Sequence, residues 1–76
     1  MNNMRRKNLK NAVDLLNRAS GIVSDALSQE EDCLDNMPEN LQMSDRYESM
    51  EQAVDYLEDA VSHIDDAITK IEEASA

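Results

Sequence analysis

Few residues of this 76-residue chain could perform chemistry, and His63 is the first of them because it is the only histidine. Asp59 precedes it by four residues and Asp66 follows it by three, so a helix would place all three on one face. Imidazole and carboxylate at this spacing can ligate a divalent cation. Helical di-iron proteins, however, use Glu-x-x-His motifs on paired helices, which this chain lacks. We therefore interpret His63 as a solvated helix residue and expect no metal and no cofactor.

Cys33 is the only cysteine, so an intrachain disulfide is excluded and a reducing cytoplasm is the expected setting. A reactive thiol needs positive charge nearby and a base within reach. The neighbours of Cys33 are instead the acids Glu30, Glu31, Asp32 and Asp35. We expect Cys33 to be a partly buried structural thiol, and we expect the protein not to be an enzyme.

A heptad repeat fills residues 45–74, which we predict to be one helix. The first apolar series consists of Tyr47, Val54, Val61 and Ile68. The second, offset by three residues, consists of Met50, Leu57, Ile64 and Ile71. This 3-4 alternation is the seam of a coiled coil. One residue before the first series stand the alanines Ala53, Ala60, Ala67 and Ala74.

Residues 4–34 repeat this design with interruptions and predict a second helix. Its seam consists of Leu9, Val13, Leu16, Ser20, Val23, Leu27, Glu30 and Leu34. The small residues before one series are Ala12, Ala19, Ala26 and Cys33. Alanines at equivalent positions allow two helices to approach closely. Ser20 and Glu30 interrupt the seam, either as tolerated packing defects or as devices that set register or receive a partner.

The connection, residues 35–44, contains the signals that end one helix and begin the next. Pro38 cannot continue a helix, but it can open a single helical turn over residues 38–42. Ser44 is a good N-cap, and Asp45 follows it at the positive end of the helix dipole. A connection of ten residues between two helices of similar length favours an antiparallel arrangement. We therefore expect a single all-α domain over residues 1–76, an antiparallel two-helix hairpin of coiled-coil type.

Charge supports the antiparallel pairing. Residues 1–18 carry a net charge of +4, and residues 44–76 carry −8. Folding back would bring the bases Arg5, Arg6, Lys7 and Lys10 near the acids Asp65, Asp66, Glu72 and Glu73. Exposed pairs of this kind contribute only ~0–1 kcal/mol each, so they set orientation more than stability.

The first helix has more apolar surface than one partner helix can cover. Leu15 and Ile22 occupy a further heptad position beside Leu16 and Val23. We expect two hairpins to pair through the first helix into a four-helix bundle, forming a homodimer. The candidate interface consists of Leu9, Leu15, Leu16, Ile22 and Val23.

The second helix carries an acidic stripe, which consists of Glu51, Glu58, Asp59, Asp65, Asp66, Glu72 and Glu73. It is either a solvated face or a surface that selects a basic partner protein. The formal net charge of −10 disfavours direct binding to nucleic acid or an anionic membrane, and no apolar run reaches transmembrane length. We expect a cytoplasmic protein-binding module with a basic host protein as partner; the alternative is a nucleic-acid mimic that inhibits a host nuclease or DNA-binding protein.

Residues 35–74 also resemble a group of known proteins. The run from Asn36 to Gln42, the run from Ser44 to Glu51 and the alanine repeats that follow are similar to small acidic helical-hairpin proteins of bacterial phages and mobile elements. That group has no assigned activity, so no functional residue can be transferred. The resemblance implies a bacterial or phage setting and an accessory or counter-defence role.

Overall fold

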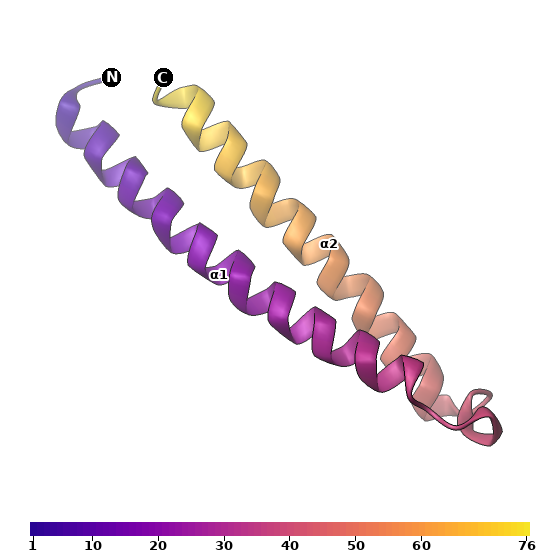
Figure 1. The fold of residues 1–76 in the computed structure, drawn as a ribbon. Helices are drawn as coiled ribbons and strands as arrows, with labels where there is room; N and C mark the ends of the chain where they lie inside the picture. Colours follow the sequence, from indigo (N-terminus) through magenta and orange to yellow (C-terminus); the bar gives the residue numbers. More distant parts are fainter.

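The computed structural model describes residues 1–76 as two long α-helices that lie side by side and run in opposite directions (Figure 1). α1 spans Asn3–Asp35, the 3-10 helix η1 spans Glu39–Leu41, and α2 spans Asp45–Ala74. The predicted all-α antiparallel hairpin is confirmed, and each helix begins and ends within one residue of its predicted bounds. Both chain ends therefore lie at one end of the hairpin and η1 at the other (Figure 1).

Side-chain caps define where α1 begins and ends. The Asn2 side-chain oxygen accepts a hydrogen bond from the Arg5 amide at 2.8 Å, which satisfies one free N–H of the first turn. At the other end the Asn36 side-chain amide donates to the Asp32 carbonyl at 2.9 Å. Pro38 follows and biases Met37 away from the helical region, so α1 cannot continue through the turn.

The turn contains the two features that the sequence predicts. Pro38 caps η1, a single turn of helix at Glu39–Leu41. The Ser44 hydroxyl accepts a hydrogen bond from the Tyr47 amide at 3.2 Å and donates one to the Leu41 carbonyl at 2.6 Å. Ser44 thus caps α2, as predicted, and also joins α2 to η1.

The hairpin is an extended rod of 59 × 14 × 13 Å. Its radius of gyration is 17.3 Å, whereas a compact domain of this length has a radius of about 11 Å. Only Val54 and Ile68, both in the seam of α2, are buried, each with 8% of its surface exposed. The remaining seam residues lie half-buried between the helices. One hairpin therefore has a contact seam but almost no enclosed core.

Candidate functional site

The five residues of the predicted oligomer interface divide into two sets. Leu9, Leu16 and Val23 are half-buried in the seam against α2. Leu15 and Ile22 point outward, with 58% and 64% of their surfaces exposed. The cause is helical geometry, since adjacent residues are about 100° apart around the axis and Leu15 cannot share the direction of Leu16. The hairpin thus covers three of these side chains itself and leaves Leu15 and Ile22, which we call the outer strip, in solvent.

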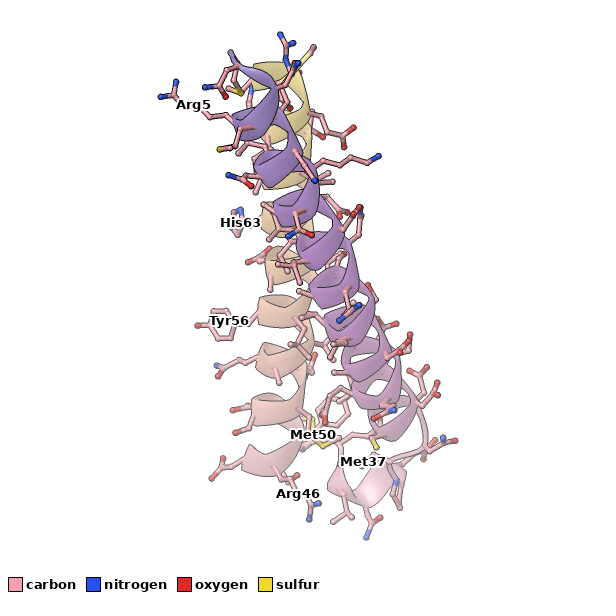
Figure 2. All side chains as sticks on the ribbon, turned by 90° about the vertical axis from the view of Figure 1, so that its left-hand side faces the viewer. Arg5, Met37, Arg46, Met50, Tyr56 and His63 are labelled. Atoms are coloured by element: carbon pink, nitrogen blue, oxygen red, sulfur yellow. The ribbon has the colours of Figure 1, made fainter.

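The outer strip is part of a larger face of the hairpin whose residues carry no charge. We call this face the alanine face, and it comprises Ala12, Leu15, Ala19, Ile22, Ala26, Ala53, Tyr56, Ala60 and Ala67. The six alanines are half-buried, while Tyr56 is 72% exposed. Figure 2 shows Arg5 of α1 projecting from the same side as Tyr56 and His63 of α2. The alanine face is therefore a shallow apolar surface shared by both helices.

The acidic stripe of α2 lies on a different side of that helix from the alanine face. All seven of its predicted residues are exposed. Asp65 accepts a hydrogen bond from the Ser20 hydroxyl at 3.3 Å, the one side-chain hydrogen bond between the two helices. The single ion pair, Lys70 to Glu73 at 3.7 Å, lies within α2 and is exposed. Nearly all of the negative charge is thus left without a basic partner in the hairpin.

The predicted meeting of α1 bases with α2 acids is only partly correct. Arg6 and Lys10 of α1 line a shallow groove together with Glu72 of α2, so the antiparallel fold does bring these groups into one region. No ion pair within 4.0 Å joins the two helices, however. Long exposed side chains lose rotamer entropy when they pair, and this offsets the weak attraction in water. The bases Arg5, Arg6, Lys7 and Lys10 therefore remain free for other contacts.

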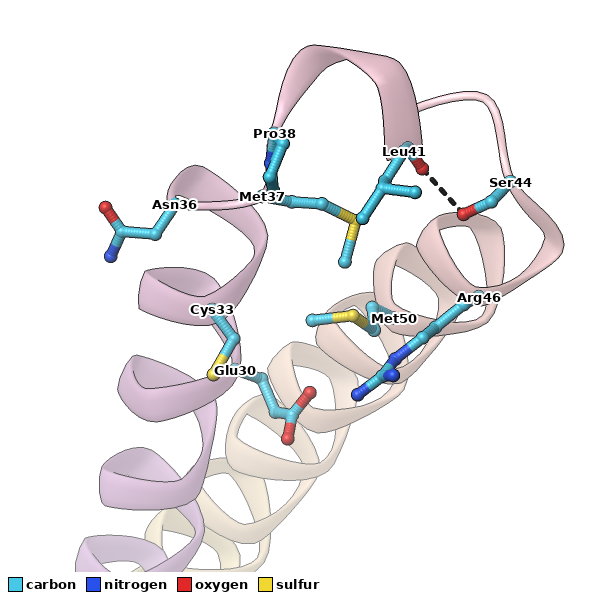
Figure 3. Close-up of a pocket in the computed structure, with 9 residues that line it drawn as sticks. All are labelled: Glu30, Cys33, Asn36, Met37, Pro38, Leu41, Ser44, Arg46 and Met50. Atoms are coloured by element: carbon cyan, nitrogen blue, oxygen red, sulfur yellow. Dashed lines mark hydrogen bonds between the residues drawn. The ribbon is translucent and has the colours of Figure 1, made fainter.

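A pocket lies at the turn, on the same side as the alanine face. Its volume is about 620 Å³, and its walls are Glu30, Cys33, Asn36, Met37, Pro38, Leu41, Ser44, Arg46 and Met50. Figure 3 shows the Met37, Leu41 and Met50 side chains directed into it, with Glu30 and Arg46 beside Met50. The pocket is thus apolar, with one carboxylate and one guanidinium at its edge. Sequence reasoning missed it; the available signals were Glu30 at a seam position and the apolar Met37 and Leu41 within the connection.

Cys33 corrects a prediction, because it is exposed rather than partly buried. Cys33 lies in the last turn of α1 and lines the open pocket at the turn, which leaves it exposed. Its thiol is accessible to reagents in solution.

His63 lies exposed on α2, as Figure 2 shows. No group of three or more His, Cys, Asp or Glu side chains is arranged to hold a metal ion. Neither helix has a segment of sufficient length and hydropathy to cross a lipid bilayer. The candidate functional features of the hairpin are the alanine face, the pocket at the turn and the acidic stripe.

Comparisons of this chain with protein-family models, with curated proteins and with solved structures find no match.

Proposed function

We propose that this protein is a non-enzymatic helical interaction module that associates with a second copy of itself through α1 and presents α2 to a basic protein. The observation that carries this proposal is the outer strip. Leu15 and Ile22 expose more than half of their surfaces, and only two residues of the whole chain are buried. A chain with so small a core gains much by covering further apolar surface.

Surface area supports self-association. The hairpin exposes 5894 Å², whereas a compact monomer of its mass exposes about 4,700 Å². A compact protein of twice the mass exposes about 7,800 Å², so two hairpins could bury up to roughly 4,000 Å² together. Permanent homodimers bury about 2,000–5,000 Å². A compact pair of hairpins would therefore bury an area in the range of permanent homodimers.

Charge favours α1 as the helix that meets the second copy. α2 carries ten acids and two bases, so two α2 helices would repel each other. α1 carries six acids and five bases and is close to neutral. Packing through α1 leaves both acidic stripes on the outside of the dimer, where they can select a basic protein surface and reject acidic ones.

Self-association is tested by sedimentation of the wild-type protein from nanomolar to millimolar concentration. We expect a monomer–dimer equilibrium with the dimer dominant at micromolar concentration. A protein that stays monomeric throughout this range would refute the self-association.

The partner is tested by affinity capture with the tagged protein from a bacterial lysate, washed at increasing salt. Binding through an acidic stripe should weaken as salt rises, because the Debye length falls from about 10 Å at 0.1 M to about 3 Å at 1 M. The captured protein should present a basic surface other than a nucleic-acid groove, and duplex DNA should not displace it. Displacement by duplex DNA would instead favour the mimic. α2 as a whole is a sparse mimic, since its ten acids over a helix of about 45 Å give one charge per ~4.5 Å, against ~1.7 Å in duplex DNA.

A further inference from the structure

The charges of α1 are divided between its two halves. The first half carries five unpaired bases, Arg5, Arg6, Lys7, Lys10 and Arg18, and one acid, Asp14. The second half carries only acids, namely Asp25, Glu30, Glu31, Asp32 and Asp35. A parallel pair of α1 helices would place like charges together. An antiparallel pair would place each basic half against the acidic half of the other copy. The helix is thus complementary to itself in one orientation only.

The outer strip then defines the register. Residues at its heptad position follow each other every seven residues: Met1, Asn8, Leu15, Ile22, Gln29 and Asn36. A two-fold axis midway between Leu15 and Ile22 pairs each Leu15 with Ile22 of the second copy. The same axis pairs Asn8 with Gln29, whose amides can exchange hydrogen bonds, and Met1 with Asn36.

This register brings the start of one chain to the pocket of the other. Met1 precedes Leu15 by fourteen residues, and Asn36 follows Ile22 by fourteen, about 21 Å along the helix in each case. Asn36 is part of the pocket wall, and Met1 and Met4 are 53% and 74% exposed. Figure 2 shows Arg5 projecting from the same side of the hairpin as Tyr56 and His63. Arg5 also precedes Cys33 of the pocket wall by four heptads, which places both residues on one side of α1.

We propose that the segment Met1–Arg5 of a second copy occupies the pocket at the turn, in an antiparallel, two-fold pairing of the α1 helices. This inference rests on the proposed self-association and specifies its geometry. An unbranched methionine side chain suits an apolar pocket that Met37 and Met50 already line. The Arg5 guanidinium then lies near the half-buried Glu30 carboxylate, which no base of its own chain pairs.

Cys33 provides the test, because it is exposed, unique and part of the pocket wall. In the variant Arg5→Cys the new thiol lies 28 residues from Cys33 on a straight helix, about 42 Å away, so a short bis-maleimide can join them only between two copies. The matched control is Lys7→Cys, which loses the same charge on a side of α1 that faces away from the second copy. We expect Arg5→Cys to form covalent dimers on the order of a hundredfold faster than Lys7→Cys at micromolar protein, because pairing holds its thiols at millimolar effective concentration.

Cross-linking of the wild-type protein through Cys33 distinguishes an antiparallel pairing of the α1 helices from a parallel one. In the antiparallel register the two Cys33 thiols are more than about 40 Å apart, so the wild type should not cross-link. Rapid cross-linking of the wild type through Cys33, or equal rates for the two variants, would overturn this geometry. Sedimentation of the same samples separates the two proposals: dimers that cross-link in the wrong pattern refute only the register, whereas monomers refute self-association itself.

Discussion

The two helices of the hairpin share a heptad design but differ in how their surfaces are used. α2 contains both buried residues, Val54 and Ile68, and its seam has no polar interruption. α1 contains no buried residue, and Ser20 and Glu30 interrupt its seam. α1 also carries the outer strip, whereas the corresponding positions of α2 are Tyr56 and His63. α2 therefore buries more of its seam, whereas α1 leaves two large aliphatic side chains, Leu15 and Ile22, in solvent.

The two helices also differ in their charge. The ten acids and two bases of α2 make it repel its own copies, while the six acids and five bases of α1 are nearly balanced and separated along the helix. α1, which leaves Leu15 and Ile22 in solvent, is thus also the helix that would repel a second copy least, as the proposed dimer requires.

The largest effect should come from placing a charge in the seam of α2. Ile68→Asp removes one of the two buried side chains and buries a carboxylate with no partner, which should cost more than about 3 kcal/mol. A small domain seldom has more than about 3–5 kcal/mol of stability, so the helical circular dichroism signal should largely disappear. The neighbouring exposed variant Thr69→Asp should retain the signal. A folded Ile68→Asp protein with an unchanged melting curve would show that α2 does not depend on its seam.

A charge on the outer strip should act on association instead of folding. Leu15→Asp should keep the helical signal, because Leu15 is exposed in the hairpin. Each apolar side chain buried in a dimer contributes about 1.5–3 kcal/mol and is present twice, so the dimer should weaken by on the order of a hundredfold or more in sedimentation. Leu16→Asp, one residue further along, should instead unfold the protein. Equal dimerisation of Leu15→Asp and wild type would remove the distinction between the helices.

The smallest effect should come from replacing Gly21, the single glycine of the chain. Gly21 lies inside the helix with an ordinary backbone conformation, and a Cβ added there would meet nothing within 4 Å. Gly21→Ala should therefore stabilise the fold by about 1 kcal/mol and raise the Tm by roughly 4–8 °C. Ser28→Ala, one heptad later and also exposed, should raise it by about half as much. Both are measured by thermal circular dichroism at one protein concentration, because association also shifts Tm. A decrease in Tm for Gly21→Ala would mean that another group occupies this side of α1.

Local signals predicted the backbone well. The periodic seams, the Ser44 cap and the break at Pro38 each act within a few residues, so they can be recognised without knowing what the chain packs against. Features that depend on opposing groups were harder to predict. Cys33 was expected to be partly buried because it continues an alanine series, but it lines the open pocket at the turn and is exposed.

The amino-acid sequence by itself determined two helices, their bounds, the turn between them and the position of the apolar and acidic stripes, because helical periodicity and capping are properties of neighbouring residues. Only the tertiary structure decided which apolar side chains the hairpin covers, that the bases of α1 stay free of the acids of α2, and that an open pocket lined by Glu30 lies at the turn. Those properties depend on which side chains face each other across a gap of a few ångströms, and that distance is set by the packing of the two helices rather than by either one alone.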